Sequence, residues 1–175
     1  MRDYYGAYQE ERYSSLYAPM RGVMSAMGKA MWHFAQLKEM TWYQWGYAGI
    51  TGFIYHMEHV YPEYIDQFKG LMAQLGLPIA YPPIEEFRET EAELGQIFRM
   101  SIRLVDEVNM ALSRFIEAAD SSDYEPLARQ AETIQMANFA PRAILTQALA
   151  MSEQGNSAAS LDAWLKGTLD APQQA

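Results

Sequence analysis

Hydrophobic residues recur every three or four positions along most of this chain, the spacing that places them on one face of an α-helix. Four long segments carry this pattern: about Ser15 to Trp45, about Ile50 to Leu75, about Glu85 to Ala119 and about Tyr124 to Glu153. The alternating pattern typical of strands does not extend over any useful length. Four such helices on one chain predict an all-α four-helix bundle.

Turn residues separate these segments. Gly46 follows the first, Gly76 stands where a left-handed C-cap of the second belongs, and the run QGNS at 154–157 breaks the fourth. The connection formed by residues 77–84 leaves the topology open. Its length suits an antiparallel hairpin. A third helix that starts nearer Thr90 would instead leave about twelve residues, enough to cross a ~40 Å bundle at ~3.3–3.6 Å per residue.

Three prolines lie within the helical segments. Pro19 fits near the start of the first helix, where its missing N–H costs little. Pro62 and Pro141 lie farther inside the second and fourth helices. They should bend these helices, because each proline removes one backbone hydrogen bond.

The bundle, residues 15–153, lies between two shorter parts. Residues 1–14 are an aromatic and polar segment, and further aromatic residues gather near the end of the first helix. Exposed aromatic residues favour protein interfaces, but they also suit a cap over the end of the bundle, and both readings remain open.

Residues 154–175 form a linker and a short amphipathic helical tail, which binds a partner or packs on its own bundle. The aromatic cluster comprises Trp42, Tyr43, Trp45 and Tyr47, and the apolar positions of the tail are Leu161, Trp164, Leu165 and Leu169.

Composition and charge narrow the classes of function. The chain has 175 residues, a formal net charge of −9, a pI of about 4.8 and no cysteine. An acidic chain without a basic arm is not expected to bind nucleic acid, which requires cations that displace counterions from phosphates. Disulfides and thiolate metal sites are excluded. The N-terminus lacks a secretory signal pattern and no apolar run reaches ~18 residues, so we expect a cytoplasmic protein that does not enter a membrane.

The candidate chemistry lies on the second helix. His56, His59, Glu63 and Asp66 stand at i, i+3, i+7 and i+10. At about 100° per residue they share a stripe of the helix surface about 80° wide. Imidazole and carboxylate groups together bind Fe²⁺, Zn²⁺ or Mn²⁺. A metal here would need further ligands from a second helix or from another subunit. The stripe points away from the apolar face of its own helix, so a site between subunits is the more natural of the two. The alternative is a solvated polar flank.

Three further features have simple structural interpretations. The methionines of the first helix line its apolar face, so we expect them to pack in the core rather than to ligate a cofactor. His33 lies opposite that face and is expected at the surface. Asp106 and Glu107 on the third helix are expected to face solvent, and the alternative is a role as carboxylate ligands of a central metal site.

The second helix also resembles the corresponding helix of the ferritin-like superfamily, most closely that of the Dps-type mini-ferritins. Trp42 falls where that group has a tryptophan near the end of its first helix, and the spacing matches from there through Asp66 and the run DQFKGLMAQLG. The turn DSSDY at 120–124 is also similar. The resemblance covers roughly residues 30–150. It implies a ferritin-like bundle that assembles as a homo-oligomer, with Asp66 as an iron ligand at a subunit interface.

Other positions depart from the family's pattern. The glutamate that follows the family's aspartate by four residues falls here on Gly70. The histidines of its first and second helices fall on Lys38 and Thr51. The Glu-x-x-His motif of larger ferritins is absent, as is the lysine-rich arm with which some members bind DNA. The usual ferroxidase centre therefore carries over only at Asp66.

Two functions remain open at this point. In the first, the chain is an oligomeric ferritin-like or Dps-like protein that binds or stores iron or a similar divalent metal, and any enzymatic activity is ferroxidase-type oxidation of Fe²⁺ in an acidic cage. In the second, it is a structural or assembly protein on the same bundle with no ferroxidase activity. The residues at Lys38 and Gly70 favour the second function, and the fold alone does not decide between the two.

Overall fold

The chain folds into α-helices throughout the part that the structure describes. In this computed structural model the described residues are 3–74, 83, 86–88, 92–122 and 124–170, and side chains are described from residue 15 onward. No strand occurs among them. The six helices are α1 (Asp3–Trp45), α2 (Ala48–Gln74), α3 (Leu94–Ser121), α4 (Glu125–Ala137), α5 (Phe139–Glu153) and α6 (Ala158–Asp170).

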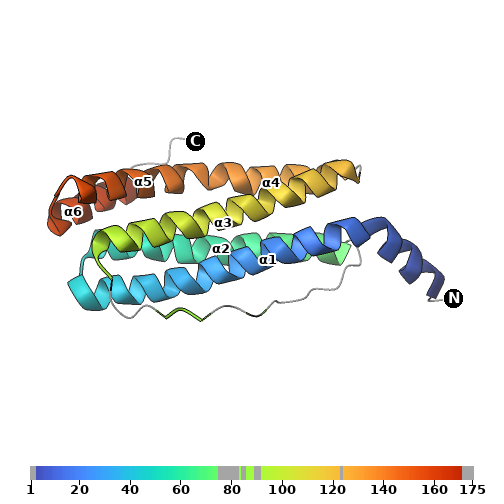
Figure 1. The fold of residues 1–175 in the computed structure, drawn as a ribbon, viewed down its shortest axis with the longest axis horizontal. Coiled ribbons are helices and arrows are strands. Elements are labelled where there is room, and N and C mark those ends of the chain that lie inside the picture. Colours follow the sequence, from blue (N-terminus) through green and yellow to red (C-terminus); the bar gives the residue numbers. More distant parts are fainter. Residues whose placement is uncertain (1–2, 75–82, 84–85, 89–91, 123, 171–175) are drawn as a thin grey trace.

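Four rods lie side by side in the bundle, namely α1, α2, α3 and the pair α4–α5 (Figure 1). α1 and α2 run in opposite directions, whereas α2 and α3 run in the same direction. Residues 75–93 therefore connect opposite ends of the bundle, which is the crossover alternative and not the hairpin. One long crossover is the connectivity of ferritin-like folds. The predicted cap at Gly76 lies outside the described residues.

α3 begins at Leu94, later than the predicted start at Glu85. The backbone N–H of Glu93 donates to Oε1 of Gln96 at 2.9 Å. This bond satisfies one donor at the start of the helix, as one half of a capping box does. The acidic residues that suggested an earlier first turn thus precede the helix, and that predicted boundary was wrong.

α1 is longer than predicted at its N-terminus. Its backbone is helical from Asp3, so residues 3–14 continue the helix, and Figure 1 shows these first turns leaning away from the bundle. Pro19 consequently lies well inside α1 and not near its start, which corrects the expectation. Pro19 has no N–H to donate to the carbonyl of Ser15, so α1 lacks one backbone hydrogen bond at this turn.

The other two internal prolines have different effects. α2 continues through Pro62 without interruption. Near Pro141 the fourth rod divides, because the regular helix is interrupted at Asn138, between α4 and α5. Pro141 has no N–H to donate to the carbonyl of Ala137, the last residue of α4, and this missing bond accounts for the break.

The C-terminal helix folds back onto the bundle. Gly155 has a φ of +83°, which suits glycine, and it turns the chain after α5. Leu161 and Leu165 of α6 are completely buried. At the start of α2 the N–H of Ile50 donates to Oδ1 of Asp162 at 2.9 Å. The tail therefore packs on its own chain, the second of the two alternatives.

Aromatic and aliphatic side chains fill the space between the rods. Phe34 of α1 stacks on Tyr61 of α2 with ring centroids 5.8 Å apart, and Phe68 of α2 meets Phe115 of α3 edge-to-face at 5.4 Å. Methionines of α1 are buried in this core, which confirms their predicted packing role: Met20, Met24 and Met27 are at most 3% exposed. No helix in the described ranges is long and apolar enough to span a membrane.

Candidate functional site

The four predicted metal ligands lie on the outer side of α2. His56, His59, Glu63 and Asp66 are all exposed, while the apolar face of α2 packs against the rest of the bundle. The stripe thus points away from its own bundle, as the sequence predicts. Within the described residues, no three His, Cys, Asp or Glu side chains gather closely enough to hold a metal ion.

Two members of the stripe have partners of their own. Nδ1 of His59 lies 3.0 Å from the carbonyl oxygen of Tyr55, and the rings of the two residues approach to 3.9 Å between centroids. Donation from Nδ1–H to that carbonyl fixes the tautomer in which Nε2 is the acceptor. Asp66 accepts a hydrogen bond from the Lys69 ammonium at 2.8 Å, and both side chains lie at the surface.

The centre of the bundle does not have the ligands of a di-iron site. Di-iron bundles project glutamates from all four helices, and two of these glutamates belong to Glu-x-x-His motifs. Here no Asp or Glu residue is fully buried in the described part of the chain, and Oε2 of Glu58, which is enclosed, lies 2.9 Å from the Lys38 ammonium. The buried polar side chains there are His33, Thr41, Ser101 and Asn138. The residues present inside the bundle do not fit a di-iron centre.

Two hydroxyl groups in this interior lack a hydrogen-bond partner within the described protein. They are the Tyr61 hydroxyl and Oγ of Ser101, and both residues are completely buried. Burial raises the pKa of the Tyr61 phenol, with a smaller contribution from Tyr64. A buried hydroxyl without a hydrogen-bond partner has lost its hydration with no compensation. Each of these two groups therefore lowers the stability of the folded chain.

The positions that depart from the family's pattern form pairs of their own. The Lys38 ammonium lies 2.9 Å from Glu58 and 3.4 Å from Glu39. The hydrogen bond to Glu58 raises the pKa of Lys38, although partial burial opposes the shift. Oγ1 of Thr51 donates to Oγ1 of Thr41 at 3.2 Å. The positive charge beside Glu58 is thus the ammonium group of Lys38.

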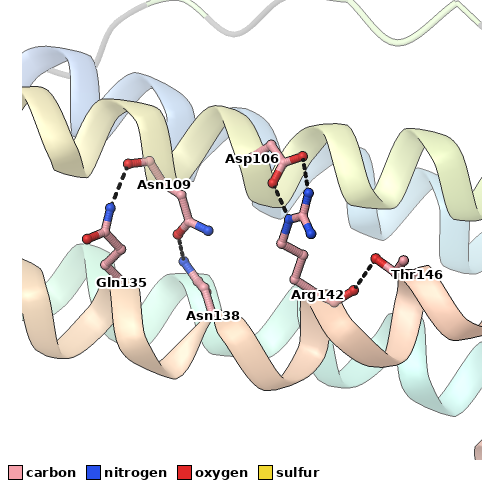
Figure 2. A network of polar contacts seen from close by, with 6 residues as sticks. All are labelled: Asp106, Asn109, Gln135, Asn138, Arg142 and Thr146. Atoms are coloured by element: carbon pink, nitrogen blue, oxygen red, sulfur yellow. Dashed lines mark hydrogen bonds and ion pairs between the residues drawn. The ribbon is translucent and has the colours of Figure 1, made fainter.

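The polar residues of α3 differ from the prediction in detail. Asp106 is partly exposed and accepts two hydrogen bonds from Arg142 of α5, at 2.5 and 3.1 Å (Figure 2). Glu107 pairs with Lys29 at 2.9 Å and with Arg103 at 3.3 Å. Both carboxylates thus hold helices together through ion pairs, and neither enters the bundle centre.

His33 is buried, at 8% exposure, so the prediction of a surface position was wrong. Its ring meets Phe87 of the crossover edge-to-face, with centroids 5.1 Å apart. This contact has no local signal in the sequence, because Phe87, which covers His33, lies more than fifty positions away.

The aromatic cluster divides between its two predicted roles. Trp45 and Tyr47 pack against the core and close one end of the bundle. Trp42 is 54% exposed and Tyr43 is 82% exposed, so these two remain available at the surface. In the tail, Trp164 packs against the core of its own chain.

Comparison with known proteins identifies the fold. No family model matches the chain, and no curated protein matches it in sequence. Among solved structures, the bacterioferritin of Desulfovibrio desulfuricans, described with its diiron site in different catalytic states, superposes with a TM-score of 0.65. The match covers 91% of this chain and 88% of that one, at 14% identity. The fold is ferritin-like. At this identity the ferritin-like match establishes the architecture alone, and it supports no particular likeness to the Dps-type group.

Proposed function

We propose that this chain is the subunit of a homo-oligomer in which the ferritin-like bundle acts as a scaffold, with no di-iron centre inside each subunit. The observation that carries this proposal is the composition of the interior. The described core is mostly apolar, none of its fully buried side chains is a carboxylate, and the partly buried Glu58 is paired with Lys38. The ligand set that a bundle-centred iron site requires is therefore missing where the fold would place it.

An exposed aromatic face on α1 supports self-association. Trp32 is 51% exposed and Tyr43 is 82% exposed. The two residues are eleven positions apart, about three turns of helix, so they lie on one side of α1. Trp42 and Tyr55 add further exposed rings on α1 and α2. Aromatic residues are enriched in the contact surfaces of proteins, where they contribute much of the binding energy.

Introducing charge on this face should break the assembly. We expect the double variant Trp32→Glu with Tyr43→Glu to elute as a smaller species than the unmodified chain, because two carboxylates would have to lose their hydration at the contact. Light scattering coupled to size-exclusion chromatography measures the mass. Both side chains lie at the surface, so the helix content measured by circular dichroism should not change.

Met110→Glu is the matched control for this experiment. Met110 is 54% exposed on α3, a helix that contributes none of the large exposed aromatic side chains. The control variant should keep the mass of the unmodified chain. If the unmodified chain itself is a 20.0 kDa monomer, the proposed assembly role is wrong.

A second candidate function, binding of iron or a similar divalent metal by the α2 stripe, is favoured by the geometry of His59. Metal-bound histidines usually donate their second ring N–H to a carbonyl or carboxylate, which orients the ring. Nδ1 of His59 has such a partner in the Tyr55 carbonyl, so Nε2 is the nitrogen available to a metal. Glu63 and Asp66 supply oxygen ligands on the same side of α2, and a neighbouring subunit would complete the shell.

The double variant His59→Ala with Asp66→Ala tests this second function. We expect it to lose binding of Fe²⁺, measured calorimetrically without oxygen, while its helix content stays the same. Glu117→Ala with Glu132→Ala removes two exposed carboxylates from other helices and should bind as the unmodified chain does. If both double variants bind Fe²⁺ with the same affinity, the stripe is a solvated polar surface and not a metal site.

A further inference from the structure

A groove lies between α1 and α3, which pack side by side and run in opposite directions (Figure 1). Two contacts fix the register of this pair. The Lys29 ammonium lies 2.9 Å from Glu107, and Oγ of Ser15 lies 3.0 Å from Oγ of Ser122. The groove lies between these two contacts and has a volume of about 590 Å³. Sites for small molecules usually have about 300–1,000 Å³, so this groove has the size of a ligand site.

Small and apolar residues form most of the walls of the groove. A Cβ at Gly22 would meet no atom within 4 Å, so the space above this glycine is empty. Met110 is 54% exposed, and a methionine side chain adapts its shape to an apolar group beside it. The groove therefore suits an apolar ligand body. Its apolar and small wall residues include Ala18, Pro19, Gly22, Ala26, Met110 and Ala111.

Arg114 is the available cation of this groove. It lies seven positions after Glu107, and Gly22 lies seven positions before Lys29. The antiparallel register therefore places Arg114 level with the empty space above Gly22. The Arg114 side chain is exposed, and within the described residues it has neither an ion pair nor a hydrogen bond.

The other cations near the groove already have partners. Lys29, which also lines it, is held by Glu107. Each further arginine whose side chain the structure describes has a carboxylate or an aromatic ring as its partner. The groove thus combines apolar walls with one unpaired positive charge.

We propose that the α1–α3 groove binds a small organic monoanion, a carboxylate with an apolar body, and that Arg114 holds the carboxylate. The guanidinium group presents a planar fork of N–H donors that matches the two oxygens of a carboxylate. One unpaired cation balances one negative charge, which favours a carboxylate over a doubly charged phosphate. The apolar body lies along the alanines of α1 and beside Met110, where it leaves water.

The net charge of the chain makes this contact selective. A chain with a formal net charge of −9 repels anions over most of its surface. An anion is therefore expected to bind only where a local cation and an apolar wall act together. Both walls belong to one chain, so this inference does not depend on the proposed self-association.

Calorimetric titration of the full-length chain with octanoate, below its micelle concentration, tests the proposal. We expect about one octanoate to bind per chain. Octanol has the same apolar body without the charge, and acetate has the charge without the body. Each should bind at least about ten-fold more weakly than octanoate, because a hydrogen bond to a charged group or the burial of the body is lost. No binding of octanoate, or equal binding of octanoate and either control ligand, would overturn the proposal.

Arg114→Gln should weaken octanoate binding at least about ten-fold and leave octanol binding unchanged. Arg99→Gln is the matched control, because it removes the same charge from the same helix. Arg99 is 53% exposed and paired with Glu153, outside the groove, so this variant should bind octanoate as the unmodified chain does. The same loss in both variants, or no loss in Arg114→Gln, would contradict the role of Arg114 and overturn the assignment.

Gly22→Leu should abolish binding of octanoate and octanol, because the new side chain would fill the groove. Gly70→Leu makes the same change at a glycine of α2 that also has open space around it, and it should bind as the unmodified chain does. Leucine is a better helix former than glycine, so circular dichroism should show no loss of helix in either variant. Octanoate binding that survives Gly22→Leu would contradict the assigned site. A lower mass of Gly22→Leu alone, measured by light scattering, would show that a second copy of the chain fills the groove and would overturn the proposal.

Discussion

Replacing Gly49 by alanine should lower the free energy of unfolding by about 2–3 kcal/mol, at the upper end of the cost of overpacking. A Cβ at this position would lie 2.1 Å from the backbone carbonyl oxygen of Asp162. Backbone atoms cannot rotate away as a side chain can, so α6 would have to move off the start of α2. That movement would also break the hydrogen bond from the Ile50 N–H to Asp162, which satisfies one of the free donors of the first helical turn.

Gly70 provides the matched control within the same helix. A Cβ there meets nothing within 4 Å, so Gly70→Ala should raise stability by up to about 1 kcal/mol through helix propensity. Asp162→Ala removes only the capping bond and should cost about 1 kcal/mol. Chemical denaturation measures all three variants. The same small gain at Gly49 as at Gly70 would mean that α6 does not pack against α2 in solution.

Tyr61→Phe should stabilise the protein, and the gain should grow at alkaline pH. Near neutral pH we expect about 1 kcal/mol, because the variant removes a buried hydroxyl that has no partner. The pKa of Tyr61 is raised in the folded state by burial. Above a pH of about 10, the ordinary pKa of a tyrosine, the phenol ionises in the unfolded chain but not in the folded one. The unfolded state then binds fewer protons, so stability falls with rising pH by about 1.4 kcal/mol per unit.

The phenylalanine variant lacks this contribution, so its stability should fall less steeply than that of the unmodified chain between pH 10 and pH 11.5. Tyr64 is present in both proteins, and its own raised pKa largely cancels in the comparison. Guanidinium unfolding at several pH values gives the two curves. Parallel curves would contradict this prediction, because they would mean that the Tyr61 hydroxyl is either exposed to solvent or hydrogen-bonded in the folded chain.

The helical periodicity was enough to predict the four rods, but it could not locate the crossover. Residues after Glu85 combine acidic and apolar positions as a first helical turn does, yet α3 begins at Leu94. Whether such a segment forms a helix or a connection depends on which end of the bundle the next helix starts from. The local sequence does not contain this information. The burial of His33 has the same origin, because Phe87 covers it from the crossover.

The candidate site was predictable on one helix and not beyond it. A period of about 3.6 residues places His56, His59, Glu63 and Asp66 on the outer side of α2. The Lys38–Glu58 pair depends on the register between α1 and α2 and has no local signal. The contact between Asp106 and Arg142 likewise requires the spacing of α3 and α5. A ligand set shared between subunits lies beyond what one chain contains, so the metal site stays a prediction.

Native mass spectrometry of the full-length chain, stripped with chelator, loaded with Fe²⁺ in air and desalted, tests the central claim most directly. The account predicts one homo-oligomer that retains at most about one iron per chain, because the described interior lacks the set of inward carboxylates that a di-iron centre requires. Two or more irons per chain that persist in His59→Ala with Asp66→Ala would contradict it, as would a monomer.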